Sequence, residues 1–209
     1  MNKLGDLSCK EFLIELASAA PAPGGGGGAA MAGALAAALA SMVANLTIGK
    51  EKFADREPEV KELLKQAEAE RVRLLTLVDE DAAVFNSFMS CYKLPKTTDE
   101  EKAARTAAIR AAAKQAATVP LNIARSSFAV LKLADRLVVS GNPGMITDGA
   151  CSGLLARAAL RCAEYNVRIN LGLTKDEVWN AQAAAELKQL LAEAETLENR
   201  LLAVTDKAL

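Results

Sequence analysis

The apolar residues between positions 57 and 91 recur every three to five residues, mostly every three or four. This spacing places them on one face of an α-helix. Pro58 fits the first turn of such a helix, where a backbone N–H has no helical partner. The pattern therefore predicts a long helix over Glu57–Cys91 that ends before Pro95, because the residue preceding a proline disfavours helical backbone.

Capping boxes, in which a Ser or Thr is followed three residues later by Glu, predict where other helices begin. These boxes are Ser8 with Glu11, Thr98 with Glu101, and Thr174 with Glu177. We expect helices over residues 8–19 and 98–117, and a terminal helix that reaches about residue 206.

Two further breaks lie in the second half of the chain. Pro120 is expected to kink the chain or to restart the helix, which then continues to about Val139. An Asn-Pro-Gly turn follows at residues 142–144, after which Thr147 and Asp148 are expected to cap another helix. Apart from the short run NVRIN, no segment alternates polar and apolar residues over the length of a strand. The sequence therefore predicts an all-α fold, a helical bundle of about seven helices with short connections.

The segment from Leu16 to Gly49 contains no charged residue. Prolines and glycines break its first half, whereas its second half is rich in alanine and predicts a helix over residues 29–48 that Gly49 ends. An uncharged helix of this length is either the buried centre of a bundle or a membrane-spanning helix. Because its apolar residues are mainly alanine rather than leucine, we favour the buried central helix and expect no membrane partner.

Five consecutive glycines, Gly24–Gly28, are expected to form a glycine-rich loop between the first two helices. Glycines let backbone N–H groups at a helix N-terminus approach an anion or a flat ring closely. The run does not fit a dinucleotide-binding loop, because a helix rather than a strand precedes it, and no Gly-Lys-Ser/Thr of a P-loop follows. A flexible linker is the alternative, although it would be entropically costly between two packed helices.

The composition limits which chemistry the chain can perform. Of its 209 residues 51% are hydrophobic and only 4% aromatic, which suits closely packed helices with small side chains. The formal net charge of -1 offers no basic field for nucleic acid. The absence of histidine removes the commonest general base and the usual zinc ligand. Four cysteines without C-x-x-C spacing, and no secretory signal, predict reduced thiols in a cytoplasmic protein.

Two carboxylates, Asp79 and Asp81, interrupt the apolar face of the long predicted helix. Asp81 lies near the positions of Val78 and Phe85, so its carboxyl group would be partly removed from water. Desolvation would raise its pKa toward the range that suits a general base. The alternative is a solvated acidic cluster on the outer face of the helix.

Other polar residues near predicted helix ends are candidates for binding an anionic or polar ligand. They are Asn45, Lys50, Lys93 and Lys96, Asp148, and the group Asn166, Arg168 and Asn170. Each has a structural alternative, because lysines at helix C-termini interact with the helix dipole, an aspartate can be a plain cap, and the last three can be surface residues. In a helix, two asparagines four residues apart share a face, where their amides beside a guanidinium could bind a polar heterocycle.

Five segments, in the same order along the chain, carry a resemblance to a known family. They are PAPGGGGGAAMAGALAAALASMVANLTIGKEKF, DEDAAVFNSFMSCYKLPKTTDEEKAAR, VPLNIA, GNPGMITDGACSGLLARAAL and NVRINL. Together they resemble the cyclodeaminase/cyclohydrolase family of folate one-carbon enzymes over nearly the whole chain, which corresponds to a single domain over residues 1–209.

The resemblance implies an all-helical homodimer that acts on a tetrahydrofolate derivative, with no metal and no cofactor beyond that substrate. It implies that Asp81, in the D-x-D-A segment, is the proton acceptor. It also implies that the glycine run, including Gly24, Gly25 and Gly26, borders the folate site. Pocket residues implied in the same way are Lys50, Lys96, Arg168 and Asn170. Ala22 and Gly27 stand where many relatives have threonine and serine, which removes two hydroxyl groups from this segment.

Two reactions are known in this family. A cyclohydrolase hydrolyses 5,10-methenyltetrahydrofolate to 10-formyltetrahydrofolate, and a cyclodeaminase forms the methenyl compound from 5-formimidoyltetrahydrofolate with release of ammonia. The chain carries no formiminotransferase partner and its extended glycine run resembles the bacterial cyclohydrolases, so we expect the cyclohydrolase. The cyclodeaminase is the main alternative, and a non-catalytic folate-binding protein is a third.

Overall fold

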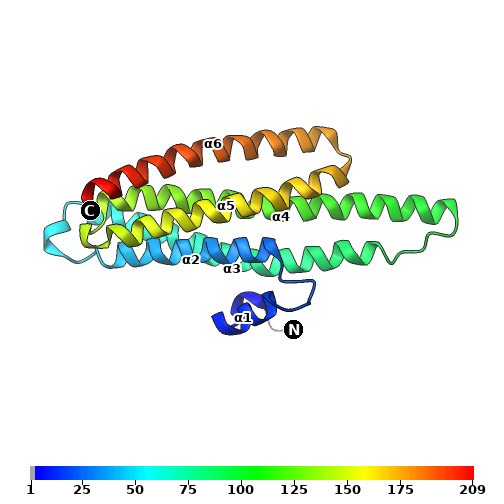
Figure 1. The fold of residues 1–209 in the computed structure, drawn as a ribbon, viewed down its shortest axis with the longest axis horizontal. Helices are drawn as coiled ribbons and strands as arrows, with labels where there is room; N and C mark the ends of the chain where they lie inside the picture. The colour runs from blue at the N-terminus through cyan, green and yellow to red at the C-terminus, as the bar shows by residue number, and fades with distance from the viewer. Residues whose placement is uncertain (1–2) are drawn as a thin grey trace.

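The computed structural model describes residues 3–209, and the regular structure in this part of the chain is entirely helical. Six α-helices and three short 3-10 helices follow one another (Figure 1). The α-helices are α1 (Cys9–Leu16), α2 (Gly25–Asn45), α3 (Glu57–Cys91), α4 (Asp99–Ser140), α5 (Ile146–Thr174) and α6 (Glu177–Ala208). The 3-10 helices are η1 (Leu4–Asp6), η2 (Glu51–Phe53) and η3 (Pro143–Met145). The predicted all-α class and the long helix over Glu57–Cys91 are confirmed.

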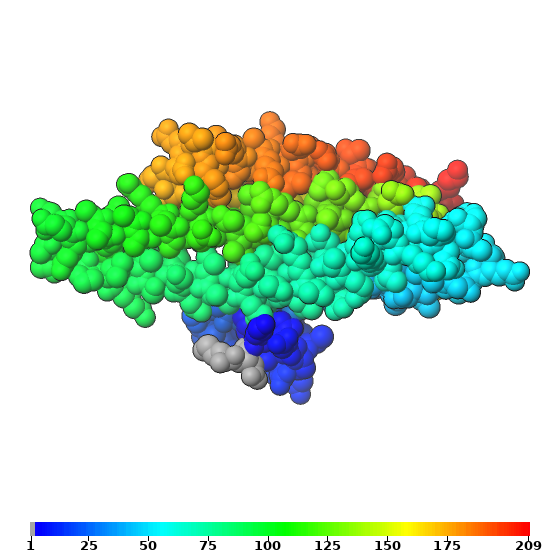
Figure 2. Space-filling model, turned by 180° about the vertical axis from the view of Figure 1, so that it is seen from behind, coloured from blue at the N-terminus to red at the C-terminus, as the bar shows by residue number. Residues whose placement is uncertain are grey.

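Helices α2, α3, α4 and α5 lie side by side and form the bundle (Figure 1). Helix α6 packs along α4 and α5, and α1 lies outside the bundle below α2 and α3. The end of α3 and the start of α4 extend beyond the other helices as a hairpin. Figure 2 shows the rear of the molecule, which α3, α4 and α6 cover. The outer faces of α2 and α5 lie on the opposite side.

Helix α2 packs closely against its neighbours in the bundle because its side chains are small. It packs against α3, α4 and α5, and Ala30, Ala36, Ala37 and Ala40 have no exposed surface. Gly33 gives Leu74 of α3 room, since a Cβ there would lie 3.0 Å from a Leu74 methyl carbon. Among the described residues, α2 is the one helix that is long and apolar enough to cross a membrane, and 61% of its most apolar stretch is buried. This burial fits the interpretation as a central helix.

The capping boxes at Ser8 and Thr98 form as predicted, each with its Glu three residues later. The third box does not form. Thr174 is the last residue of α5, and Asp176 instead accepts a hydrogen bond from the Trp179 N–H to cap α6. The predicted Thr147–Asp148 cap is also wrong, because α5 already begins at Ile146, directly after η3.

The glycine run does not form the predicted loop. Gly25–Gly28 are the first turn of α2, so the connection from α1 ends at Gly24. The helix does not restart at Pro120, because α4 continues through this proline as a single helix, which gives six α-helices, close to the predicted number of about seven. The run NVRIN is helical within α5.

Candidate active site

The N-terminus of α2 meets the side of α3 at Asp81. Gly24 is the N-cap residue, has extended backbone and offers no side chain to the free N–H groups of the first turn. The backbone N–H of Gly27 donates a hydrogen bond to the Asp81 carboxylate. The Asp81 carboxylate, from the neighbouring helix α3, therefore replaces the side chain of an N-cap residue at the start of α2. The positive end of the helix dipole there favours a negative charge.

Gly26 provides the space that this carboxylate occupies. A Cβ at Gly26 would lie 2.6 Å from Cγ of Asp81, which is closer than carbon atoms approach without a clash. A Cβ at Gly28, by contrast, would make only an ordinary contact of 3.9 Å with Leu16. The close approach of α2 to Asp81 therefore requires glycine at position 26 and not at position 28.

Burial raises the pKa of the Asp81 carboxyl group, and the hydrogen bond from Gly27 opposes this shift in part. The raised pKa follows from desolvation, which disfavours the charged form. A carboxylate whose pKa is raised is, once ionised, a stronger proton acceptor than an exposed aspartate, which suits it to take a proton from a reacting group.

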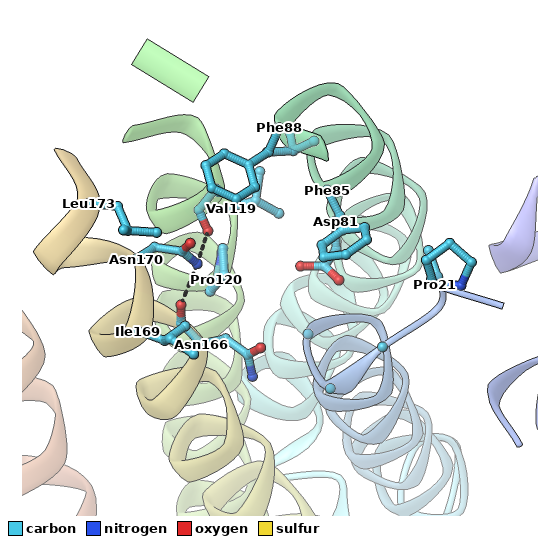
Figure 3. Close-up of a pocket in the computed structure, with 16 residues that line it drawn as sticks. Pro21, Asp81, Phe85, Phe88, Val119, Pro120, Asn166, Ile169, Asn170 and Leu173 are labelled. Carbon is cyan, nitrogen blue, oxygen red and sulfur yellow. Dashed lines mark hydrogen bonds between the residues drawn. The ribbon is translucent and has the colours of Figure 1, made fainter. Parts of the chain in front are cut away.

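Asp81 faces a cavity of about 330 Å³ between the start of α2, the second half of α3, the middle of α4 and the end of α5 (Figure 3). Pro21 and Ala22 close one side of it. Its remaining walls are Gly24, Gly25, Gly26, Val84, Phe85, Phe88, Ala116, Val119, Pro120, Asn166, Ile169, Asn170 and Leu173. Asp81 is the one ionisable side chain among these lining residues. The cavity is therefore a mainly apolar pocket that contains one carboxylate and two amides.

The structure brings five of the predicted site residues to this pocket: Asp81, Gly24, Gly25, Gly26 and Asn170. Asn166, which shares a helix face with Asn170, also lines it. Their roles in binding or catalysis stay predictions.

The structure places three other predicted residues at the opposite end of α2. Asn45 is the last residue of α2, about 30 Å from its first residue at the usual helical rise. Lys50 follows it in the exposed connection to α3, and Asp148 lies in the first turn of α5. None of the three lines the pocket around Asp81.

Lys96 and Arg168 also lie away from the pocket. Lys96 is exposed in the turn between α3 and α4. Arg168 pairs with the buried Glu164 at 3.3 Å on the side of α5 that faces α6. It is therefore turned away from the two asparagines that we expected it to accompany.

The aromatic wall of the pocket, Phe85 and Phe88 of α3, was not among the predicted site residues. Phe85 belongs to the apolar pattern of this helix, but the pattern does not separate core residues from pocket residues. The signal that was available is the position of Phe85 four residues after Asp81, on the same helix face. Pro120 was interpreted only as a helix breaker, although it lines the pocket.

Within residues 3–209, no group of three or more Asp, Glu or Cys side chains is arranged to hold a metal ion. In the pocket, the chain itself offers one partly buried carboxylate, two amides and the first backbone N–H groups of α2.

The chain is an all-α helical bundle whose pocket contains a partly buried carboxylate at a helix N-terminus. Residues 8–189 match the model of the family described as Formiminotransferase-cyclodeaminase. The chain belongs to this family.

Two kinds of relative share this chain's sequence. A methenyltetrahydrofolate cyclohydrolase from Methylorubrum extorquens is 44% identical over 197 residues, which cover 94% of this chain and 95% of that protein. A formimidoyltransferase-cyclodeaminase from Sus scrofa is 34% identical over 187 residues, which cover 90% of this chain but only 35% of that protein. The fold matches the crystal structure of a formiminotetrahydrofolate cyclodeaminase from Thermotoga maritima with a TM-score of 0.88, 30% identity and 98% coverage of both chains.

Proposed function

We propose that this protein hydrolyses 5,10-methenyltetrahydrofolate to 10-formyltetrahydrofolate, with Asp81 as the general base. The observation that carries the proposal is the partly buried Asp81 carboxylate at the N-terminus of α2, in a pocket with no other ionisable side chain. The cyclohydrolase from Methylorubrum extorquens, similar over 94% of this chain, supports the choice of reaction.

The charge of the pocket suits this substrate. The methenyl carbon bridges N5 and N10 as a cationic amidinium group, and Asp81 supplies a negative charge in a mainly apolar cavity. Attraction between opposite charges is stronger in such surroundings than in water. A bound cation would also favour the ionised form of Asp81, so substrate binding would prepare the base for proton transfer.

The reaction needs one proton acceptor that also returns a proton. Asp81 takes a proton from a water molecule while the oxygen of that water bonds to the methenyl carbon. The tetrahedral adduct then collapses, the bond from this carbon to N5 breaks, and Asp81 returns the proton to N5. The hydroxyl proton of the adduct leaves as the formyl C=O forms, so each turnover releases one proton. A positioned acid–base group of this kind contributes roughly 10²–10⁴-fold in rate.

The cyclodeaminase reaction is the second candidate, because the fold matches a formiminotetrahydrofolate cyclodeaminase over 98% of both chains. In this reaction N10 attacks the carbon of the protonated formimidoyl group, and Asp81 accepts the N10 proton and returns it to the amino group of the adduct. The bond from the carbon to this amino group then breaks, ammonia leaves, and the methenyl cation remains. The same carboxylate therefore serves both reactions, and the geometry of Asp81 does not choose between them.

Two matched assays distinguish the candidates. We expect the purified protein to accelerate the loss of 5,10-methenyltetrahydrofolate absorbance above the uncatalysed rate, and to release no ammonia from 5-formimidoyltetrahydrofolate. Ammonia release with little methenyl hydrolysis would contradict the proposal and support the cyclodeaminase. Folate binding without either reaction would support a binding protein.

We further propose that the enzyme needs no cofactor, because water and one carboxylate balance the reaction. Activity should therefore survive dialysis against a strong chelator. A fall in rate that a metal ion restores would contradict this.

We also propose that the protein is a homodimer joined through the outer faces of α2 and α5. These faces expose several large apolar side chains. They are Leu35 and Met42 of α2 and Leu154 and Tyr165 of α5. Exposed apolar side chains on neighbouring helices are typical of protein interfaces. Leu35→Glu should convert the dimer to a monomer by light scattering, whereas Val72→Glu, on α3, should not.

A further inference from the structure

Pro120 leaves a gap in the hydrogen bonding of α4 at the wall of the pocket. Proline has no N–H, so the carbonyl oxygen of Ala116, four residues earlier, lacks its helical donor. The side chain of Asn170, on α5, fills this gap. Its Nδ2 donates to the Ala116 oxygen at 3.0 Å and to the Asn166 backbone oxygen at 2.8 Å (Figure 3).

These two bonds fix which way the Asn170 amide points. An amide rotated by 180° would place its oxygen against two carbonyl oxygens, where neither group can donate. Both hydrogens of Nδ2 are therefore used, and Oδ1 is left as an acceptor. Within the described residues, no donor bonds to this Oδ1, and Asn170 lines the pocket.

Asn166 repeats the arrangement one helical turn earlier. Its Nδ2 donates to the backbone oxygen of Cys162 at 2.9 Å, which leaves its Oδ1 without a donor among the described residues. Its amide lies over the start of α2, since a Cβ on Gly25 would be 3.5 Å from Nδ2. Two amide oxygens on one face of α5 are therefore available to a ligand in the pocket.

We propose that Asn166 and Asn170 bind the hydrogen-bond donor edge of the substrate heterocycle. The proposal rests on the function proposed above and names the part of the substrate that this wall of the pocket selects. The pterin ring carries two neighbouring donors, N3–H and the 2-amino group. Two acceptors held by backbone carbonyls match such an edge, and the apolar residues beside them, Ile169 and Leu173, suit the flat faces of the ring.

The pair acts on specificity rather than on the chemical step. A buried acceptor that loses its donor is left unpaired, which is why sites built to bind a polar group reject analogues that lack it. Asn166 and Asn170 are therefore specificity-determining residues, and Pro120 is a positioning residue that acts through Asn170.

The test compares the substrate with a 2-desamino analogue, in which hydrogen replaces the 2-amino group. We expect the wild-type protein to lose roughly ten- to a hundred-fold in kcat/KM on the analogue. Asn166→Ala and Asn170→Ala should raise KM for the parent substrate while kcat stays within about threefold. At least one of them should lose the preference for the parent. Asn199→Ala, at an exposed position on α6, is the matched control and should keep it.

Three outcomes would overturn the proposal. They are equal use of both compounds by the wild-type protein, a preference that survives in both asparagine variants, and a preference that disappears only in Asp81→Asn. The last would assign the donor edge to Asp81. Asn166→Ala leaves the gap at Pro120 filled, so it tests the proposal even if Asn170→Ala does not fold.

Calorimetry with unreactive 5-formyltetrahydrofolate and its 2-desamino analogue separates this proposal from the proposed reaction. Discrimination in binding that depends on the asparagines would support the acceptor pair even if the hydrolysis assay failed. Active hydrolysis without such discrimination would overturn the acceptor pair alone, and no binding of either compound would overturn both.

Discussion

The two ends of α2 differ in how their polar groups are satisfied. At its C-terminal end, Thr47 Oγ1 donates to the Val43 oxygen at 2.7 Å and accepts from the Asn142 N–H at 2.8 Å, and the Asn142 amide donates to Leu46 O at 3.1 Å. At its N-terminal end, Asp81 binds the first turn and opens onto a cavity. The first end joins elements of the fold, whereas the second retains groups that can act on a ligand.

This difference shows why sequence motifs alone were a poor guide to the site. The segments around both ends contributed to the family resemblance, and both supplied predicted ligands. Only the N-terminal end combines glycine, a partly buried carboxylate and a cavity. A motif that completes its own hydrogen bonds is explained by folding, and one that leaves acceptors open to a cavity points to function.

Replacement of Asp81, at the N-terminal end of α2, should have the largest effect on catalysis of all the substitutions at the two ends of this helix. Asp81→Asn removes the proton acceptor but keeps the size of the side chain, so kcat should fall by roughly 10²–10⁴-fold. Steady-state assays with 5,10-methenyltetrahydrofolate, together with calorimetric binding, would measure this. Glu80→Gln, at the exposed neighbouring position, should leave kcat unchanged. An active Asp81→Asn protein would remove Asp81 from the mechanism.

Two glycines of the α2 N-terminus should respond in opposite ways. Gly26→Ala places a methyl group against the Asp81 carboxyl, and the displacement should lower kcat by about 10²-fold. Gly28→Ala meets only an ordinary contact and should stabilise α2 by about 0.5–1 kcal/mol, because alanine favours helix. Assays and thermal unfolding of both variants measure the contrast. Equal losses of kcat in the two variants would show that the contact between Gly26 and the Asp81 carboxyl group is not required for catalysis.

The pH dependence tests the electrostatics of the same end. The base must be ionised, and its pKa is raised by burial, so kcat/KM should fall about tenfold per pH unit below a midpoint above the usual aspartate range. Asp81 then holds a proton more tightly in the folded protein than in the unfolded chain. Its contribution to the free energy of unfolding therefore falls as the pH rises from its pKa in the unfolded chain to its raised pKa in the folded protein. A profile of kcat/KM against pH for the wild-type protein and Glu80→Gln measures the midpoint. A midpoint near that of free aspartate would contradict the burial of Asp81.

The C-terminal end of α2 should affect stability and not catalysis. Thr47→Val removes the acceptor of the Asn142 N–H in a buried position and should cost about 1–3 kcal/mol. Denaturant unfolding measures this loss, and kcat should stay at the wild-type value. Thr147→Val, at an exposed position, should change stability by less than about 0.5 kcal/mol. A large loss of kcat in Thr47→Val would show that this end belongs to the active site.

Periodicity and caps predicted much of the fold. The bounds of α3 and the starts of α1 and α4 follow from local patterns, since apolar spacing and Ser or Thr caps act within a few residues. Local patterns failed where a distant residue supplies what the segment lacks. Asp81 caps the glycine turn of α2, and Asn170 satisfies the carbonyl that Pro120 leaves open, so both segments remain helical.

The candidate site could be predicted only in part for the same reason. Asp81 and the glycines were found because their residue types are unusual in their surroundings. Lys50 lies far from Asp81 and the glycines because it follows the opposite end of the 21-residue helix α2. The direction and length of this helix in the fold cannot be inferred from a local sequence pattern. Arg168 was placed beside Asn170 by sequence distance, but its pairing with Glu164 turns it toward α6.

The unbroken length of α3 has a consequence for how this chain tolerates insertions. Glu57, at one end of this helix, accepts the Gly49 N–H at 2.9 Å, and Asp81 lies 24 residues further along, about 36 Å away. One residue inserted between them would turn Asp81 by about 100° around the helix axis, away from α2. The exposed turn at residues 92–98 has no such restriction, so variation in length should be confined to that turn.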